Sequence, residues 1–410
     1  MTKCVLNFNN FKSNIVLDLC GSKSVSQRAL IINFLHPTDK KIINLSTSND
    51  TKTLNEILNK EGFFLNVQDG GTTLRFLLCV LSLRNRNYFI NGSNSLKKRP
   101  LKKLILNLEK LGVSFQFQKN DYQIPLFIKG GGLFSKELII DSNQTSQFAS
   151  ALALIAPYID GGLKLIVNKK IASRPFFDMT LKMMKICGAK ISNKKDTIVI
   201  KGIGYNKNYS KIESDWTSVS YIYAIVAFSK NKSIVCSTFY EKSLQGDIDV
   251  MTFFNLLGVE TVFYDDKIIL KKHNKFPIPK LIKWNVLDTP DLALTYMTAC
   301  LGLGVNLELT GVKNLLFKES NRLKVMKKEL EKFNVQVIME DDFFFMDTSS
   351  RKIEENSIDT YSDHRIALAF SPLVIIAKKI TINDFSVVSK SYPQFWSDLK
   401  KIGIKISSKD

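Results

Sequence analysis

Apolar and polar positions recur along the chain in one pattern. Six times, a run with apolar residues at helical spacing ends at Gly or Asn, and a segment typical of a strand follows. The six terminal residues are Gly62, Gly112, Gly188, Gly258, Asn334 and Gly403. Because Gly and Asn tolerate the left-handed conformation just past a helix end, the pattern predicts six helices, each followed by a strand.

The distances between these positions predict a repeated unit. They are 50, 76, 70, 76 and 69 residues, which indicates units of about 70 residues after a shortened first one. Such a period is typical of a βαβ-type repeat, and the alternative is six helix ends that merely look alike. Three units in each of two domains would divide the chain near residue 213.

Several other predicted helices begin at positions that favour anions. Apolar runs predict helices at residues 24–36, 76–83 and 366–375. Pro100 and Pro175 each follow an arginine and suit the first turn of a helix. A helix N-terminus exposes unpaired N–H groups and the positive end of the helix dipole, so these starts can bind phosphate or carboxylate.

The composition is that of a globular protein large enough for two domains. The chain has 410 residues, of which 45% are hydrophobic and 23% are charged. The net charge of +20 raises the question of nucleic acid, but the lysines are spread through every segment without a long polybasic block. We therefore expect no nucleic-acid partner.

Cysteine and histidine give no sign of a metal site. The six Cys residues are scattered without a Cys-x-x-Cys pair, and there are only three His residues. Cys79, Cys187 and Cys300 lie in apolar helical runs and are expected to be buried thiols. The N-terminus lacks a signal-peptide pattern, and no apolar run has membrane-spanning length. We expect a cytoplasmic protein that does not bind membranes.

The chain has few arginines, and most of them lie in motif-like segments. Only nine of the 58 basic residues are Arg, as expected if an AT-rich coding bias favours Lys. Arg would then remain where planar, bidentate recognition of carboxylate or phosphate is needed. Six of the nine lie in motif-like segments at predicted helix starts or loops: Arg28, Arg75, Arg99, Arg174, Arg322 and Arg365. Their distribution predicts one anion site assembled from the whole length of the chain.

Six segments carry the candidate chemistry. They are Gly-Ser-Lys-Ser-Val-Ser-Gln-Arg at 21–28, Asp-Gly-Gly-Thr-Thr-Leu-Arg at 69–75, Thr-Pro-Asp-Leu-Ala at 289–293, Lys-Glu-Ser-Asn-Arg at 318–322, Ser-Asp-His-Arg at 362–365 and Lys-Ser-Tyr-Pro at 390–393. Each alone also fits a capped, solvated helix start. Their common content of cations, acids and small turn residues points to binding and acid–base chemistry on anions.

Taken in order, these segments resemble the 5-enolpyruvylshikimate-3-phosphate synthase family, over residues from about 14 to 400. The resemblance implies an α/β (α+β) enolpyruvyl transferase fold, an inside-out α/β barrel with six βαβαββ repeats, three in each of two domains. One domain would be residues 21–212, carrying the shikimate 3-phosphate side of a cleft. The other would be residues 1–20 plus 213–410, carrying an acid–base pair and part of a phosphoenolpyruvate clamp.

The resemblance also implies the role of individual residues. The catalytic residues would be Asp291, Glu319 and Lys23. The contacts to shikimate 3-phosphate would be Lys23, Ser24, Arg28, Thr145, Ser146, Gln147, Ser173, Asp291, Asn314 and Lys318. The contacts to phosphoenolpyruvate would be Lys23, Gly71, Thr72, Arg99, Gln147, Arg322, Arg365 and Lys390. The family needs no metal or organic cofactor, acts on small molecules and is expected to be monomeric.

The implied chemistry explains why these residue types are needed. The 5-hydroxyl of shikimate 3-phosphate adds to C2 of phosphoenolpyruvate while C3 takes a proton, and the tetrahedral intermediate then loses phosphate and a C3 proton. Asp291 and Glu319 can exchange these protons, with Lys23 beside them. Arg clamps would neutralise the substrates and hold the reacting atoms close, which can remove roughly 7–11 kcal/mol of the barrier.

The chain departs from the family pattern at four places. Asp69 stands where Asn is usual, Phe76 where Pro is usual, and Phe176 where Tyr is common. The first repeat is also about 20 residues short between Gly62 and Asp69. We expect the shortening to remove an outer strand pair, and none of these changes removes a charged catalytic group.

Two other functions remain as alternatives. A UDP-N-acetylglucosamine enolpyruvyl transferase has the same fold and chemistry, but that family carries an essential Cys in a loop whose counterpart here, residues 91–98, has none. A basic RNA-binding protein on a similar repeat would be expected to show nucleic-acid motifs, which this sequence lacks. A non-catalytic relative is disfavoured by the presence of Lys23, Asp291, Glu319 and Arg365.

Overall fold

The chain folds into two compact units. The computed structural model describes all residues except 1, 38, 61, 141–144, 168–170, 274, 276 and 410. Unit 1 comprises Met1–Gly21 and Glu213–Asp410, and unit 2 comprises Ser22–Ile212. The sequence-based division differs from this one only at Gly21, whose backbone forms an antiparallel bridge with Ser214 in unit 1. Unit 2 is therefore an insertion into the chain of unit 1.

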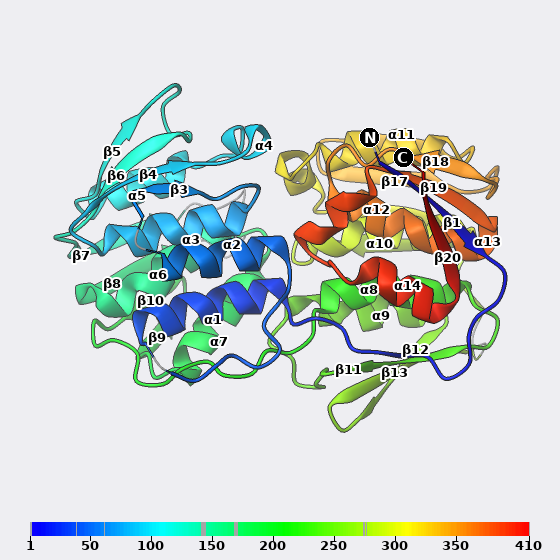
Figure 1. The fold of residues 1–410 in the computed structure, drawn as a ribbon, viewed down its shortest axis with the longest axis horizontal. Helices are drawn as coiled ribbons and strands as arrows, with labels where there is room; N and C mark the ends of the chain where they lie inside the picture. The colour runs from blue at the N-terminus through cyan, green and yellow to red at the C-terminus, as the bar shows by residue number, and fades with distance from the viewer. Residues whose placement is uncertain are drawn as a thin grey trace. The chain divides into compact units, whose positions relative to one another are not determined.

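Five four-stranded sheets share one strand order (Figure 1). In each sheet the first and second strands of the repeat are parallel, the second pairs antiparallel with the fourth, and the fourth pairs antiparallel with the third. This constant order is the βαβαββ repeat that the resemblance implied. Unit 2 contains two of these sheets. One consists of β3 (Phe64–Asn66), β4 (Asn87–Asn91), β6 (Leu126–Lys129) and β5 (Ser114–Phe117). The other consists of β7 (Phe134–Ile140), β8 (Asp160–Val167), β10 (Thr197–Ile200) and β9 (Ile191–Lys194).

Unit 1 contains the other three sheets, two of which use strands from before the insertion. The first consists of β2 (Val16–Leu17), β11 (Ser233–Ser237), β13 (Lys267–Lys272) and β12 (Val259–Tyr264). The second consists of β14 (Leu281–Asn285), β15 (Asn306–Thr310), β17 (Phe343–Asp347) and β16 (Gln336–Glu340). The third consists of β18 (Asn356–Ile358), β19 (Lys379–Asn383), β1 (Lys3–Phe8) and β20 (Ile404–Lys409). The N-terminal strand β1 thus completes the last repeat of the chain.

Each complete repeat has one buried and one amphipathic helix. The buried helix connects the first two strands, is buried on nearly every side and packs in the interior of its unit. These helices are α3 (Gly71–Ser82), α6 (Gln147–Ile155), α8 (Trp216–Phe228), α10 (Ala293–Leu303) and α12 (His364–Phe370). The amphipathic helices are α5 (Lys102–Lys110), α7 (Arg174–Ile186), α9 (Val250–Leu256), α11 (Arg322–Glu331) and α14 (Phe395–Ile402). The core of unit 1 lies between its buried helices and the inner faces of its sheets.

The helix ends agree with the glycine pattern at five of six positions. Gly112, Gly188, Gly258, Asn334 and Gly403 all have the left-handed conformation after α5, α7, α9, α11 and α14. The prediction for Gly62 is wrong, because helix α2 (Asn49–Asn59) already ends at Asn59 and Gly62 has no positive φ. The left-handed cap is thus found where a helix passes directly into the third strand of a complete repeat.

Three predicted helices have different limits in the structure. Helix α1 (Lys23–Leu35) begins and ends one residue earlier than predicted, and α3 begins at Gly71 rather than Phe76. The helix predicted at 366–375 is divided into α12, a 3₁₀ turn and α13 (Val374–Ala377). Pro372 lies in that turn, where its missing N–H cannot continue an α-helical ladder.

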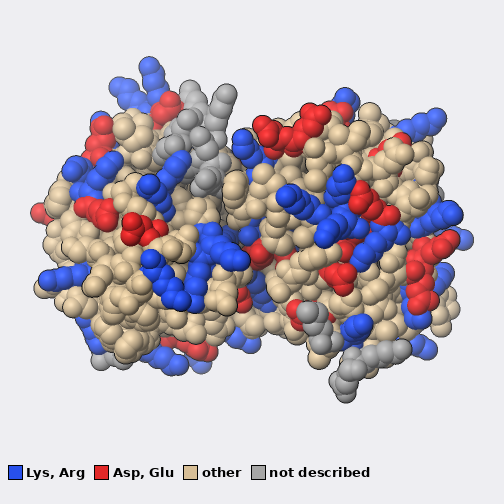
Figure 2. Space-filling model, turned by 90° about the horizontal axis from the view of Figure 1, so that it is seen from above, with Lys and Arg blue, Asp and Glu red and all other residues tan. Residues whose placement is uncertain are grey.

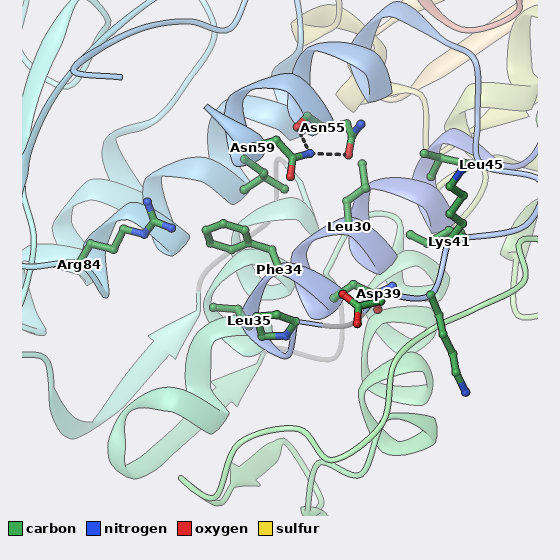
Figure 3. A pocket seen from close by; sticks show the side chains of 14 residues that line it. Leu30, Phe34, Leu35, Asp39, Lys41, Leu45, Asn55, Asn59 and Arg84 are labelled. Atoms are coloured by element: carbon green, nitrogen blue, oxygen red, sulfur yellow. Dashed lines mark hydrogen bonds between the residues drawn. The ribbon is translucent and has the colours of Figure 1, made fainter. Parts of the chain in front are cut away.

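The first repeat lacks its outer strand pair, as expected. Among the described residues no strand lies between α2 and β3, and only a parallel bridge between Ile43 and Lys211 remains of its sheet. A groove of about 830 Å³ is lined by residues of α1, of α2 and of the segment between them. Figure 3 shows Leu30, Phe34 and the guanidinium of Arg84 along it.

Charge is divided unequally between the two units. Unit 2 holds 30 of the 58 Lys and Arg residues but only 12 of the 38 Asp and Glu residues, a formal charge of +18 against +2 for unit 1. Figure 2 shows Lys and Arg side chains spread over the face drawn, with Asp and Glu side chains between them. None of the described helices combines the length and apolar character needed to span a bilayer.

Candidate active site

Most of the candidate residues lie at or just before helix N-termini. In unit 2 they fall at the starts of α1, α3, α6 and α7. In unit 1 they fall around the starts of α10, α11 and α12 and shortly before α14. Successive repeats therefore place candidate residues at equivalent helix starts, where backbone N–H groups are unpaired. The residues form two sets, one in each unit.

Lys23 and Ser24 begin helix α1. The ammonium of Lys23 lies 3.3 Å from Oδ2 of Asp50, at the start of α2, and both side chains are largely buried. Helix α1 carries no acidic residue in its first turn, so Asp50 is the acid that the structure places against this cation. The sequence motif did not predict Asp50 as a partner, because it lies 27 residues away in another helix.

Arg28 is buried inside unit 2. Its Nε donates to Oγ1 of Thr180 at 2.6 Å, and its Nη atoms donate to Oγ of Ser150 and to the backbone oxygens of Ser24 and Phe176. These acceptors are all neutral, and no carboxylate of the described residues pairs with Arg28. Burial accordingly lowers the pKa of Arg28 to about 9, which shows how poorly its charge is compensated. An anion nearby would supply that compensation.

Phe76 gives Arg28 an unexpected neighbour. The guanidinium carbon of Arg28 lies 5.4 Å from the centre of the Phe76 ring, within the range of a cation–π interaction. Phe76 is fully buried in α3, so its ring is a fixed surface for Arg28. Phe76, which replaces the usual Pro, therefore supports a candidate binding residue from inside α3 rather than at its start.

Gly71, Arg75 and Arg99 meet at the start of α3. Arg75 donates to the backbone oxygen of Gly71 at 2.9 Å and to Oε1 of Gln147 at 2.8 Å. A Cβ at position 71 would collide with the guanidinium of Arg99 and would lie 2.8 Å from Nη1 of Arg75. Gly71 therefore lets two guanidinium groups approach the backbone, and Thr72 follows it in the first turn.

The polar segment before α6 and the start of α7 complete the unit 2 set. Oγ1 of Thr145 accepts from the backbone N–H of Gln147, and Ser146 is buried next to it. Ser173 precedes α7 with φ of 59°, a left-handed conformation that costs energy for a residue with a Cβ. Arg174 pairs with Asp178 in the next turn at 2.9 Å. The structure thus brings Gly71, Arg99 and Gln147 together through Arg75, whereas Ser173 lies on a separate element.

Asp291 is the centre of the unit 1 set. Its Oδ1 accepts from Nζ of Lys318 at 3.2 Å and from Nη1 of Arg322 at 3.1 Å, and its Oδ2 accepts from Nη2 of Arg365 at 2.7 Å. Asp291 lies in a 3₁₀ turn, Pro290–Leu292, directly before α10. Three candidate cations from α11, its preceding loop and α12 thus converge on one candidate base.

Glu319 joins the same network. Its Oε2 accepts from Nη2 of Arg322 at 2.7 Å, and its Oε1 lies 3.3 Å from Nζ of Lys390. Arg322 therefore connects the carboxylates of Asp291 and Glu319, and Lys390 brings the segment before α14 to them. The two candidate acid–base groups and the three candidate clamp residues of unit 1 form one cluster, as the motifs indicated.

The electrostatics of the cluster favour ionised carboxylates. Burial alone would raise the pKa of Asp291, but the surrounding cations, Arg365 foremost, hold this pKa well below its ordinary value. Burial would likewise lower the pKa of Arg322 and Arg365, but their carboxylate partners raise both above the ordinary value. An anion that took some of these cations would therefore raise the pKa of Asp291.

Asn314 is buried with an unpaired oxygen. It lies in the 3₁₀ turn Lys313–Phe317, and its Oδ1 has no hydrogen-bond partner among the described residues. A buried amide oxygen without a donor is unfavourable unless a ligand or a water supplies one. This supports the expected role of Asn314 in binding.

The structure adds three residues that the sequence did not assign to the site, and it gives Arg75, already counted among the arginines of the anion site, a partner there. Asp363 accepts hydrogen bonds from Arg322, the hydroxyl of Tyr221 accepts from Nη1 of Arg365 at 3.2 Å, and Asp247 is a buried carboxyl near Asp291 and Arg365. Arg75 donates to Gln147 and so positions it. Asp363 and Arg75 lie within quoted motifs, so their positions gave a signal. Tyr221 and Asp247 lie outside every motif and were found only through the fold.

Comparison with known proteins identifies the family. The family model described as EPSP synthase (3-phosphoshikimate 1-carboxyvinyltransferase) matches residues 56–399. A curated relative of that name from Bacteroides fragilis is 34% identical over 394 residues, which is 95% of each chain. The chain belongs to the EPSP synthase family. Another relative with this name, from Aliivibrio fischeri, is 30% identical over 423 residues, covering 95% of this chain and 97% of its own.

The fold of solved EPSP synthases agrees with this assignment. A structure titled as EPSP synthase from Acinetobacter baumannii matches with a TM-score of 0.79 at 18% identity, covering all of both chains. The two-domain α/β repeat fold expected from the sequence is therefore confirmed. The family match begins in α2, ahead of the shortened stretch between Gly62 and Asp69, and the relative from Bacteroides fragilis covers nearly the whole chain.

Proposed function

We propose that this chain transfers the enolpyruvyl group of phosphoenolpyruvate to the 5-hydroxyl of shikimate 3-phosphate, releasing phosphate. This is the step of the shikimate pathway, and so of aromatic amino-acid biosynthesis, that the family name describes. The observation that carries the proposal is the cluster in which Arg322 joins Asp291 and Glu319. It combines two carboxylates for proton transfer with cations that can hold a phosphate and a carboxylate.

The unit 1 cluster has the groups that the two chemical steps need. One carboxylate must take the hydroxyl proton, and one must deliver a proton to C3 and remove one again. We assign this work to Asp291 and Glu319, which are held close together by Arg322. Arg322, Arg365 and Lys390 would bind phosphoenolpyruvate, and Asn314 and Lys318 would bind shikimate 3-phosphate beside Asp291.

The unit 2 set would bind both substrates. Lys23, Ser24, Arg28 and the polar residues Thr145, Ser146, Gln147 and Ser173 are assigned to shikimate 3-phosphate. Gly71, Thr72, Arg99 and Gln147 are assigned to phosphoenolpyruvate, with Lys23 also contributing to it and to catalysis. The uncompensated charge of Arg28 and the formal charge of +18 on this unit support a role in attracting and holding anionic substrates.

We infer further that the enzyme works as a cytoplasmic monomer on small molecules, without nucleic acid, membrane or cofactor. The dispersed lysines support the absence of a nucleic-acid partner. Sedimentation of the purified protein at micromolar concentration would test the monomer, and a faster-sedimenting species would contradict it.

One assay tests the proposed activity. Release of inorganic phosphate from phosphoenolpyruvate is measured with shikimate 3-phosphate, with UDP-N-acetylglucosamine and without an acceptor. We expect release only with shikimate 3-phosphate, and mass spectrometry should show the enolpyruvyl product. Equal release with UDP-N-acetylglucosamine would assign the other enolpyruvyl transfer, and release without any acceptor would indicate simple hydrolysis.

A further inference from the structure

Asp363 is a fully buried carboxylate behind the unit 1 cluster. Its Oδ2 accepts from Nε of Arg322 at 2.8 Å, and its Oδ1 accepts from Nη2 of Arg322 at 3.2 Å. This is a bidentate pair in which the planar guanidinium meets both carboxylate oxygens. The same guanidinium also donates through Nη1 to Asp291 and through Nη2, which also donates to Asp363, to Glu319. Asp363 therefore holds the guanidinium of Arg322 in a position from which it also reaches Asp291 and Glu319.

The same carboxylate fixes the second clamp arginine through its backbone. Oδ1 of Asp363 accepts from the backbone N–H of Arg365 at 3.0 Å, so Asp363 is the N-cap of α12. Arg365 is thereby placed in the first turn of α12, from which its side chain reaches Asp291. One buried acid therefore determines where both arginines stand.

The backbone directly before Asp363 has an energetically unfavourable conformation. Tyr361 and Ser362 both have positive φ, at 51° and 57°, and the N–H of Asp363 donates to the backbone oxygen of Thr360 at 2.8 Å. Two successive left-handed residues with side chains are unfavourable, and the surrounding structure must compensate for them. Ser320 adds a further hydrogen bond to Oδ2 of Asp363 at 3.0 Å.

Asp363 differs from the other acidic partners of Arg322 in its exposure to ligands. Its side chain is 0% exposed, whereas that of Asp291 is 24% exposed and can meet a substrate. When an anionic substrate competes for Arg322, or when Asp291 or Glu319 takes a proton, the pairs on the open side weaken. The pair with Asp363 remains and keeps the guanidinium in place.

We propose that Asp363 is a positioning residue for the anion clamp, acting through the side chain of Arg322 and the backbone of Arg365. It touches neither substrate, so its removal should impair phosphoenolpyruvate use without abolishing the proton transfers. The inference rests on the proposed function, because the clamp is defined by the substrate it binds. Asp363 belongs to neither set of residues that the motifs predicted.

The first test separates positioning from general stability. Asp363→Asn keeps an oxygen that can cap α12 but replaces one acceptor facing Arg322 with an NH₂ group. We expect the KM for phosphoenolpyruvate to rise at least tenfold, kcat to fall less than the KM rises, and the Kd of shikimate 3-phosphate to change less than twofold. Glu329→Gln is the control for the loss of a buried carboxylate, because Glu329 is equally buried and pairs with Lys332. Since Glu329 also accepts from Tyr361, this variant tests whether disturbing the segment before Asp363 is enough to raise the KM.

A double-mutant cycle tests whether Asp363 acts through Arg322. In the background of Arg322→Ala, adding Asp363→Asn should leave the remaining kcat/KM for phosphoenolpyruvate unchanged within twofold. Full additivity of the two losses would overturn the proposal. Equal losses in Asp363→Asn and Glu329→Gln would overturn it as well, because the effect would then be one of stability.

Ser320→Ala keeps the proposal testable if Asp363→Asn does not fold. It removes one hydrogen bond to the same carboxylate, so we expect a two- to fivefold rise in the KM for phosphoenolpyruvate and no change in kcat. An unchanged KM in this variant together with an unfolded Asp363→Asn would contradict the positioning role. If the wild-type chain shows no acceptor-dependent phosphate release, the proposed function fails; if it does and Asp363→Asn matches it, only this inference fails.

Discussion

The guanidinium of Arg365 donates to Oδ2 of Asp291 at 2.7 Å, which joins the first turn of α12 to the turn before α10. The proposed anion clamp and the proposed base thus neutralise each other when no substrate is present. A substrate anion that binds Arg365 must compete with Asp291 for it. Substrate binding and activation of the base are therefore linked by the same ion pair.

This link predicts that phosphoenolpyruvate binding changes the protonation of Asp291. Arg365 and its neighbouring cations hold the pKa of Asp291 well below its ordinary value against the opposing effect of burial. An anion that takes these cations should raise the pKa, so the complex should bind a proton at pH values between the lowered pKa of the free protein and the raised pKa of the complex. The uptake should therefore grow as the pH falls toward the ordinary pKa of a carboxyl, about 4. Calorimetry of phosphoenolpyruvate binding in two buffers of different ionisation enthalpy measures this uptake.

Asp291→Asn is the control for proton uptake. The ligand titrates in the same way with both proteins, so the difference between them reports on Asp291 alone. Identical proton numbers for the wild type and the variant would show that Asp291 keeps its cations in the complex.

Removal of either carboxylate should reduce turnover strongly. We expect Glu319→Gln and Asp291→Asn to lower kcat by about 10²–10⁴-fold, the usual contribution of a general acid or base, with shikimate 3-phosphate still bound. Steady-state kinetics and equilibrium binding measure the two effects separately. Glu331→Gln, which alters an exposed pair with Lys327 on the same helix α11, should leave kcat unchanged. A variant that retains more than about a third of the wild-type turnover is not an essential proton carrier.

Gly71→Ala should impair phosphoenolpyruvate binding by moving Arg99. The added methyl would collide with the guanidinium of Arg99 and press on Arg75, so both must shift away from the start of α3. We expect a KM for phosphoenolpyruvate at least tenfold higher, with a smaller change for shikimate 3-phosphate. Gly62→Ala is a mild control, because its nearest atoms would be 3.8 Å and 3.9 Å away. Equal kinetics for the two variants would place Arg99 outside the clamp.

The buried carboxyl of Asp247 predicts that the variant Asp247→Asn becomes more stable than the wild type as the pH rises. Burial, with nearby Asp291 and Asp215, raises the pKa of Asp247 to about 7 despite a hydrogen bond from Thr217. The folded chain therefore keeps a proton that the unfolded chain releases above pH 4, so the wild type loses stability as the pH rises from about 4 to about 7. Asp247→Asn removes this loss. The difference between the Tm of the variant and that of the wild type should grow as the pH rises from about 4 to about 7. Above that range the difference should stay constant.

The control for this prediction is another buried carboxylate. Asp398 accepts from Tyr392 and Lys401, so Asp398→Asn should lower the Tm rather than raise it. A Tm difference for Asp247→Asn that does not vary between pH 4 and pH 8 would show that Asp247 does not titrate in the folded protein. Differential scanning calorimetry at several pH values provides these data.

Local sequence determined the repeat and much of the candidate site. Gly112, Gly188 and Gly258 end helices in the left-handed conformation because the chain needs that conformation wherever a helix turns directly into a strand. The arginines in the motifs lie at helix starts because the pattern of apolar residues places those starts. The grouping of Glu319 with Arg322 follows from a spacing of three residues, because the short segment before α11 keeps Glu319 near the first residue of that helix.

Tertiary structure decided the partners that lie far apart in the chain. The pairs of Arg365 with Asp291 and of Arg28 with Thr180 join residues 74 and 152 positions apart, and no local pattern encodes such contacts. Burial, which leaves Arg28 without a compensating acid and raises the pKa of Asp247, likewise depends on what surrounds a residue after folding. Periodicity fixes which face of an element is apolar, but the packing of one element on another decides which polar groups meet, because those contacts form only when the buried faces come together.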